Sequence, residues 1–472
     1  MPSIRRTRTL DRLRKGLALP SPAVIVVTGG PRTGKSSALR AVLGQDRTGQ
    51  EIGRHLIAVR GAPGPTSRHL RVLADTLRRG GIGGEHPCTS WSEGFEPLRE
   101  ALEGDRVPRV LILDEVHHLH HGSPELGLAL ARLWTGARAR ALPLRLVLVS
   151  SDSTAVDQLV GEGGPLESAD PHTVTVDDLS TAEIREHLDG WSPRDRFLLQ
   201  ACLGRSPSTI GLVDPDVRLS TNLHRLVFDP EGRLHGQPIR HLERRIQKPR
   251  RYVGILGAMA EGAQDWRSIH AANPAFSSGN QLAPYMSTLQ DLGWVEAERS
   301  LDAPPRARKR RYHIADPLVA FWYGVVEPAL GILLEGKSAA STWRGVLAGR
   351  RFARHASAVF PRALHRVLAE NGDDLVGARA RQIGGLWGDG YDLAVAGTLR
   401  NGAALYGTAV WGRIATVADA AAVHGHMRAT RYGFGREARL RVVFAAAGAT
   451  EGLTRAVARD ELLLVVPLEK AF

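Results

Sequence analysis

A glycine-rich stretch with a single lysine is the part of this sequence best suited to phosphate chemistry. It has the pattern G-x4-G-K-S, in which backbone N–H groups surround phosphate oxygens and the start of a helix adds positive potential. We expect Lys35 to act as a catalytic cation on the β- and γ-phosphates of ATP and the Ser36 hydroxyl to bind Mg²⁺. The residues predicted to bind the nucleotide here are Gly29, Gly30, Pro31, Arg32, Thr33, Gly34, Lys35, Ser36 and Ser37.

An acidic pair follows a second apolar run. Residues 110–113 are apolar and are followed by Asp114 and Glu115. We predict that Asp114 holds Mg²⁺, directly or through water, and that Glu115 orients and deprotonates an attacking water. The alternative is an Asp-Glu pair that only caps a helix. Together with Lys35, the pair predicts hydrolysis of a nucleoside triphosphate.

Two further patterns overlap this acidic pair. Residues 114–117 spell D-E-V-H, as in some helicases, but such helicases need a second half of similar kind and the sequence shows none. Four histidines also cluster at spacings that could place two of them on one helix face as metal ligands. No cysteine or carboxylate at a suitable spacing supports that site, so we expect a solvated helix start instead. The four are His117, His118, His120 and His121.

Short apolar runs predict the elements that position these residues. Residues 23–28, 110–113 and 144–149 are rich in Val, Ile and Leu, which is typical of parallel strands buried on both faces. Residues 37–43 predict a helix that starts directly after the glycine-rich stretch. This strand–loop–helix order is the context that the phosphate-binding pattern requires. The predicted fold class is therefore α/β, with the parallel sheet of a P-loop NTPase.

Residues 252–314 predict a winged helix-turn-helix. Apolar residues recur at helical spacing in 252–259 and 282–289, and residues 294–298 and 311–314 predict two wing strands. The last helix has no Arg or Lys, which disfavours guanine readout, so we expect contact with DNA phosphates through the loop between the strands. The alternative is a packing module with a solvated loop. The basic loop residues are Arg306, Arg308, Lys309, Arg310 and Arg311.

The composition bounds the partners and the compartment. The 472 residues carry a formal net charge of +13, which favours a polyanionic partner, nucleic acid first and a membrane surface second. Only two cysteines occur, Cys88 and Cys202, which excludes a disulfide scaffold and predicts a reducing, cytoplasmic setting. The sequence has no run of about 18 uncharged apolar residues, so we expect no transmembrane helix.

The order of these parts resembles the archaeal-type ATPases of the STAND branch of P-loop NTPases. The resemblance covers nearly the whole chain and rests on GGPRTGKSS, LILDEVHHL, YMSTLQDLGWVE and YHIADPLVAFWYGVVEP. It implies four parts in order along the chain. These are an ATPase core in 1–175, a helical lid in 176–245, a winged helix-turn-helix in 246–330 and a small α/β nuclease-like domain in 331–472.

The same resemblance implies roles for single residues. Ser151 is the candidate sensor of the γ-phosphate, with a plain helix N-cap as the alternative, and Pro207 is expected to pack near the adenine. The aromatic residues 321–323 are expected to be buried between domains. Members of this group often have Arg and Glu before the first strand. Residues 6–13 keep arginines but contain no Glu, which leaves their role at the nucleotide open.

The C-terminal region resembles a PD-(D/E)xK nuclease without its catalytic residues. That chemistry needs two or three acidic Mg²⁺ ligands and a lysine. Asp392 matches one acid, but Thr408 and Val410 occupy the E-x-K positions, and Pro361 stands where a further acid is expected. No lysine occurs between positions 337 and 470. We therefore expect a catalytically dead domain that binds nucleic acid through its arginines, or serves dimerisation or partner docking.

These patterns together predict an ATP-binding, slowly hydrolysing ATPase. It would act as a nucleotide-controlled switch and engage DNA through the winged helix and the basic C-terminal region. One alternative is an ATP-gated DNA nuclease, against which the missing E-x-K residues argue. The other is a regulatory scaffold that binds protein partners rather than DNA, and a steep fall of DNA affinity with salt would argue against it.

Overall fold

The computed structural model describes most of the chain. The described residues are 4, 6–30, 33–44, 56–83, 88–104, 107–246, 248–304, 306–331 and 339–472. Pro31 and Arg32, both predicted to bind the nucleotide, lie outside them. The chain forms two compact units. Unit 1 holds residues 1–179 and 206–208, and unit 2 holds residues 180–205 and 209–472.

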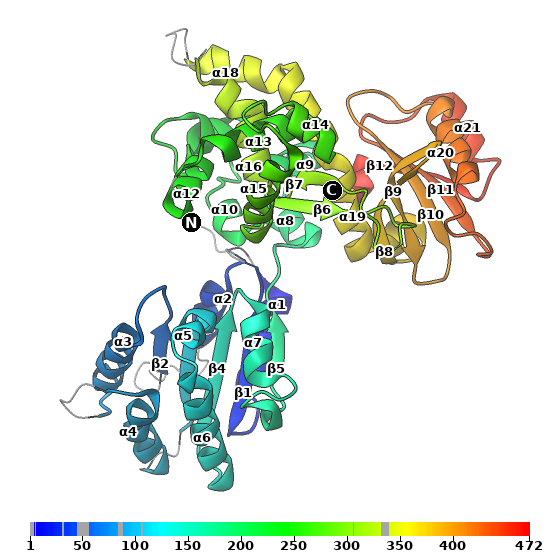
Figure 1. The fold of residues 1–472 in the computed structure, drawn as a ribbon. Coiled ribbons are helices and arrows are strands. Elements are labelled where there is room, and N and C mark those ends of the chain that lie inside the picture. The colour runs from blue at the N-terminus through cyan, green and yellow to red at the C-terminus, as the bar shows by residue number, and fades with distance from the viewer. Residues whose placement is uncertain are drawn as a thin grey trace. The chain divides into compact units, whose positions relative to one another are not determined.

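Unit 1 is built on a five-stranded parallel sheet, in the order β2-β3-β4-β1-β5 (Figure 1). The three predicted strands are confirmed as β1, β3 and β4, which lie next to one another in the sheet. Their carboxyl ends therefore meet at one edge, where open α/β sheets place their sites. The strands are β1 (Ala23–Thr28), β2 (Leu56–Arg60), β3 (Arg109–Asp114), β4 (Leu144–Ser150) and β5 (His172–Thr175).

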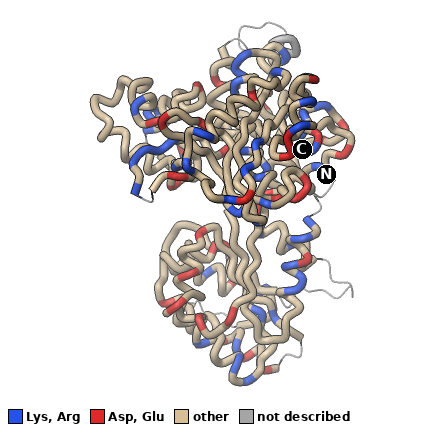
Figure 2. The backbone as a smooth tube through the Cα atoms, turned by 90° about the vertical axis from the view of Figure 1, so that its right-hand side faces the viewer, with Lys and Arg blue, Asp and Glu red and all other residues tan. Residues whose placement is uncertain are grey.

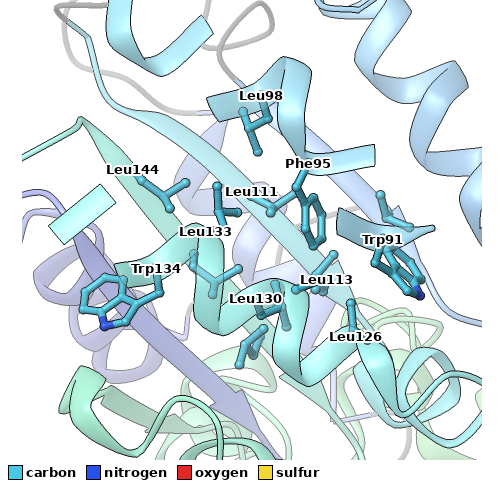
Figure 3. Packing of buried hydrophobic residues seen from close by; sticks show 14 of the residues in the cluster. Trp91, Phe95, Leu98, Leu111, Leu113, Leu126, Leu130, Leu133, Trp134 and Leu144 are labelled. Carbon is cyan, nitrogen blue, oxygen red and sulfur yellow. The ribbon is translucent and has the colours of Figure 1, made fainter. Parts of the chain in front are cut away.

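Helices cover both faces of this sheet, because alternate strand residues are apolar on both sides. Ile25 and Val27 pack with α1 and α2, and Val24 and Val26 pack into the larger core on the opposite face. Figure 3 shows that larger core, where Trp91, Phe95 and leucines of helices and strands interlock. The helices are α1 (Thr7–Leu17), α2 (Lys35–Leu43), α3 (Thr66–Arg79), α4 (Trp91–Gly104), α5 (Val116–His121), α6 (Glu125–Ala139) and α7 (Ser153–Val160).

Unit 2 begins with helices and a two-stranded hairpin. The helices and strands predicted in 252–314 are confirmed as α13, α15, β6 and β7, with β6 and β7 antiparallel and Val295 opposite Ile314, and a further short helix, α14, lies between α13 and α15. The elements are α8 (Thr181–His187), α9 (Pro193–Leu203), α11 (Leu219–Leu223), α12 (Gln237–Arg245), α13 (Arg250–Ala260), α14 (Trp266–Ala271), α15 (Gly279–Asp291), β6 (Val295–Glu298), β7 (Arg311–Ile314) and α16 (Pro317–Phe321). A short helix, α10 (Pro207–Ile210), starts in unit 1 and ends in unit 2.

A second five-stranded sheet forms the C-terminal part of unit 2, in the order β12-β11-β10-β9-β8. Strands β8, β9 and β10 are antiparallel neighbours, whereas β10, β11 and β12 are parallel. The elements are α18 (Ala339–Ala348), α19 (Arg350–Val376), β8 (Ala380–Gly388), β9 (Tyr391–Leu399), β10 (Ala404–Val410), α20 (Val417–Ala429), β11 (Arg439–Ala445), α21 (Glu451–Val457), β12 (Leu463–Pro467) and α22 (Leu468–Ala471).

The C-terminal sheet shares its core with the helices that precede it. Phe197 of α9 lies 5.2 Å from Phe360 of α19, 4.7 Å from Trp411 and 5.2 Å from Phe472, measured between ring centroids. Buried aromatic clusters of this kind hold elements together through area and edge-to-face geometry. This cluster joins residues of the expected lid (176–245) to residues of the expected C-terminal part (331–472) within one compact unit.

Two further features of the described chain bear on the predictions. The aromatic residues Phe321, Trp322 and Tyr323 are almost fully buried, at the end of α16 and in the π-helical turn Trp322–Val326. Their burial is confirmed, and their position between domains stays a prediction. Among the described residues, no helix combines the length and the hydropathy that crossing a bilayer requires.

Candidate functional site

The loop after β1 is shaped by two glycines. Gly29 has a φ of +147°, and a Cβ at this position would lie 2.1 Å from the carbonyl oxygen of Val176. Gly34 has a φ of +85° and precedes α2, so it turns the chain into the helix. Both conformations are open to glycine and rarely to other residues. The motif therefore needs glycine at Gly29, where the Val176 carbonyl comes close, and at Gly34, where the chain turns into α2.

Lys35 sits inside this loop at the start of α2. Its Nζ donates to the carbonyl oxygens of Gly29 and Gly30, at 2.8 and 2.9 Å, and its side chain is buried. Burial lowers the pKa of Lys35, and the nearby carboxylates of Glu115 and Asp114 oppose that shift. The ammonium is therefore held at the loop by weak neutral acceptors, which a phosphate oxygen could replace with a charge-assisted bond.

Ser36 links the two motifs that the sequence placed far apart. Its hydroxyl donates to Asp114 Oδ2 at 3.0 Å. Asp114 Oδ1 is buried, and no residue of the described chain gives it a hydrogen bond. Arg60, which is exposed, approaches Oδ2 at 3.8 Å. A hydroxyl and a carboxylate with an unsatisfied buried oxygen form an oxygen donor set of the kind that Mg²⁺ prefers, so these residues fit the ion that accompanies ATP.

Glu115 lies beside Asp114 in an unusual backbone conformation. Its φ is +53°, which is uncommon for a residue with a Cβ and is often found at functional sites. Gly61 makes room for it, since a Cβ at Gly61 would lie 2.5 Å from the Glu115 carbonyl oxygen. The carboxylate accepts a hydrogen bond from the Ser151 hydroxyl at 2.8 Å. The structure thus brings Glu115 and Ser151 together, as their predicted roles require.

Ser151 is not the N-cap of the helix that follows β4. That position belongs to Asp152, whose side chain accepts a hydrogen bond from the N–H of Thr154. The alternative given for Ser151 is therefore wrong, because its hydroxyl is directed to Glu115 instead. Its role as a sensor of the γ-phosphate stays a prediction.

The histidine cluster in α5 differs from the expected solvated helix start. His117, His118 and His120 are partly buried, and burial lowers the pKa of each. His117 Nδ1 lies 3.2 Å from the Ser150 hydroxyl and 3.5 Å from Glu115 Oε2, so this residue borders the candidate site. The described residues contain no group of three or more His, Cys, Asp or Glu side chains arranged for a metal ion.

Arg6 is the main contact that the sequence did not assign. It is buried just before α1, where it donates to the carbonyl oxygen of Thr33 at 2.6 Å and to that of Asp177. Pro207 lies on the same side of the loop, since its ring atoms would be 3.6 Å from a Cβ at Gly34. The only sequence signal for Arg6 was the retained arginine before the first strand. The remaining predicted contact, Ser37, is exposed on α2.

The basic loop of the hairpin divides into two groups. Arg306, Arg308, Lys309 and Arg310 are exposed, so they remain candidates for phosphate contact. Lys and Arg also occur throughout both units, with Asp and Glu among them (Figure 2).

Arg311 differs from the other four residues because it is paired within the protein, so its contact with nucleic acid stays a prediction with a competing partner. Its two terminal nitrogens donate to the two carboxylate oxygens of Asp392 at 2.9 and 2.8 Å, and its guanidinium lies 4.5 Å from the ring centroid of Trp387. This bidentate pair commits the guanidinium within the protein. It also occupies the one carboxylate that matched the nuclease pattern.

The comparison with protein families identifies the first unit. Residues 20–153 match the family model described as AAA domain. This segment is therefore an AAA-type P-loop ATPase domain, for which ATP binding is expected, and its parallel sheet has the predicted P-loop NTPase fold. No curated protein matches the chain.

Solved structures similar to the chain include archaeal proteins. A Walker-type ATPase of Pyrococcus abyssi has 19% identity and a TM-score of 0.47, over 68% of this chain and 95% of that one. The Orc1 protein of Aeropyrum pernix in complex with DNA has 17% identity and a TM-score of 0.40, over 70% of this chain and 95% of that one. The Orc2 protein of Aeropyrum pernix in complexes with ADPNP and ADP has 15% identity and a TM-score of 0.42, over 74% of this chain and 97% of that one. At these values the likeness carries no conclusion about function.

Proposed function

We propose that this protein is a slowly hydrolysing ATPase that acts as a nucleotide-controlled switch and engages DNA. The observation that carries the proposal is the 3.0 Å hydrogen bond from Ser36 to Asp114, which joins the phosphate-binding loop to the acidic pair. The four-part division into ATPase core, lid, winged helix-turn-helix and nuclease-like domain remains part of this proposal.

The side chains suggest a division of labour. Bound ATP with its Mg²⁺ would supply the γ-phosphate and a divalent charge to polarise it. Lys35 would exchange the Gly29 and Gly30 carbonyls for phosphate oxygens, Ser36 and Asp114 would hold the ion, and Glu115 would take a proton from water. Because one Glu115 oxygen accepts the Ser151 hydroxyl, the base is partly engaged, which supports slow turnover.

Replacing Glu115 by Gln tests this assignment. The amide keeps the shape of the side chain but cannot accept a proton, so Glu115→Gln should bind ATP with unchanged affinity and release phosphate about 10²- to 10⁴-fold more slowly. Binding is measured by calorimetry and turnover by phosphate release, each with and without DNA. Glu125→Gln in α6 is the matched control, and phosphate release by Glu115→Gln at the normal rate would show that another base acts.

Engagement of DNA is supported by the positive charge of the chain and by the exposed residues Arg306, Arg308, Lys309 and Arg310. The nuclease alternative has less support, because Thr408 and Val410 replace the Glu that would bind Mg²⁺ and the Lys that would position water, and because Arg311 pairs with Asp392. The scaffold alternative predicts little DNA affinity at any salt concentration, and binding measured across a salt range separates it from the switch.

A further inference from the structure

One carboxylate in unit 2 receives hydrogen bonds from two distant segments of the chain. Oε2 of Glu370, in α19, accepts hydrogen bonds from the backbone N–H and the hydroxyl of Thr181, at 2.8 and 2.9 Å. The other oxygen, Oε1, accepts a hydrogen bond from the Arg205 guanidinium at 2.6 Å. Thr181 and Arg205 are both buried, at 2% and 6% exposure. Such charge-assisted bonds at buried positions are the strong class of hydrogen bond.

The two segments that Glu370 holds lie at two of the three points where the chain passes between the units, the third being after Ser208. In the first passage, residues 177–181, the chain leaves unit 1 after Leu179, and in the second passage, residues 205–207, it enters unit 1 again after Arg205. Thr181 is the second residue of unit 2 in the first passage, and Arg205 is the last residue of unit 2 in the second. A single side chain of α19 thus fixes the unit 2 ends of both passages.

The unit 1 ends of the same passages touch the phosphate-binding loop. Arg6 joins the Thr33 carbonyl in that loop to the Asp177 carbonyl in the first passage. In the second passage, Pro207 lies beside Gly34 of the loop. A movement of the loop on binding a phosphate would therefore reach both passages within unit 1, and each leads along the chain to a partner of Glu370.

We propose that Glu370 couples the nucleotide site to the C-terminal part of unit 2 by tying the two passages to α19. The proposal rests on the proposed function, since it assumes that the loop binds ATP. Asn371, directly after Glu370, has non-helical angles (φ −132°, ψ 28°), so α19 is kinked at this point. A displacement of Glu370 would act where α19 is divided into two helical segments. The first segment packs with α9, and the second leads into β8.

The test measures how far the effect of a nucleotide spreads. Hydrogen exchange is followed by mass spectrometry with and without a non-hydrolysable ATP analogue, in the full chain and in Glu370→Gln. In the wild type we expect altered protection in the loop, in both passages and in α19. In the variant, the amide can still accept from Thr181 but loses the charge that holds Arg205. The effect should then stop before α19, while affinity for the analogue changes less than about threefold.

Asp374→Asn is the matched control, because it removes the same charge from an exposed site on the same helix. Thr181→Val removes one hydrogen-bond donor and no charge, so it should weaken the nucleotide effect on α19 to an intermediate extent. It replaces Glu370→Gln in the test if that variant does not fold. A wild type in which the changes stay within unit 1 would overturn the coupling but leave the ATP site intact. So would a Glu370→Gln variant that behaves like the control. A wild type with no change at the loop would overturn both the coupling and the proposed function.

Discussion

At the scale of single residues, the central feature is the pair of hydrogen bonds from Lys35 to the backbone of its own loop. Its ammonium is buried against two carbonyl oxygens, with Asp114 and Glu115 near enough to act on its pKa. Burial of a cation without a full ionic partner is costly, and a phosphate would relieve that cost. This cost supports the proposed contact of Lys35 with a phosphate.

Replacing Lys35 by Ala should lower the affinity for ATP at least about tenfold, because a charge-assisted bond to phosphate contributes about 1.5–3 kcal/mol. Calorimetric titration with ATP measures the loss. Lys15→Ala, at an exposed position of α1, is the control for the change in net charge. Equal affinities of the wild type and Lys35→Ala would remove the assignment of the loop.

The hairpin β6–β7 is attached to the C-terminal sheet at the end where its loop begins and ends. Glu298, the last residue of β6, accepts the N–H of Gly385 at 2.7 Å, and Arg311, the first residue of β7, pairs with Asp392. Leu301, at the start of the loop, donates its N–H to the carbonyl of Gly385. The later part of the loop carries the exposed cations. Attachment of both loop ends restricts where these cations can lie, which would reduce the entropy lost if the loop contacts a phosphate backbone.

Neutralising the loop should weaken DNA binding and reduce its dependence on salt. In the variant with Arg306, Arg308, Lys309 and Arg310 all changed to Ala, up to four phosphate contacts are lost, so the slope of log affinity against log salt should fall by up to about 3.6. Binding to duplex DNA is measured by fluorescence anisotropy at several salt concentrations.

A matched variant separates local contacts from net charge. Arg68, Arg71, Arg78 and Arg79 are exposed on α3 of unit 1, and changing all four to Ala removes the same charge. If both quadruple variants lose affinity equally, net charge and not the hairpin loop is responsible, and the loop is a packing feature with solvated side chains.

At the scale of the whole molecule, unit 2 is held together by buried groups from distant parts of the chain. His355 of α19 is an example. Its Nε2 bonds to the carbonyl of Ala201 in α9 at 2.8 Å, and its ring faces Phe321. Burial lowers the pKa of His355 to about 4. The folded protein therefore keeps this ring neutral at a pH where the unfolded chain would protonate it.

The stability of unit 2 should consequently depend on pH. Between an unfolded pKa of about 6.5 and the folded value of about 4, the unfolded state binds more protons, so the free energy of unfolding falls as the pH falls through this window and levels off below it. From pH 7 to pH 5 His355 should account for up to about 2 kcal/mol. Urea unfolding of the wild type and His355→Gln at both pH values measures the difference, and parallel losses in the two proteins would contradict it.

Much of unit 1 could be predicted because its signals are local. The runs that became β1, β3 and β4 are rich in Val, Ile and Leu, as is typical of strands buried on both faces, and the candidate site residues lie at or after their carboxyl ends. Lys35, Ser36, Asp114, Glu115 and Ser151 belong to short motifs, and the meeting of strand ends at one sheet edge explains why they come together. The partial burial of the α5 histidines was missed, because it depends on neighbours that the motif does not contain.

The sequence by itself determined the phosphate-binding loop, the acidic pair and the elements of the helix–hairpin segment, since each is a matter of residue type at fixed spacing. Only the tertiary structure decided which side chains pair across large separations: Arg6 with Thr33 and Asp177, Arg311 with Asp392, and Glu370 with Thr181 and Arg205. The physical reason is that an arginine or a carboxylate has the same local signature whether it is solvated or paired. Its partner is set by the packing of elements, which no spacing along the chain encodes.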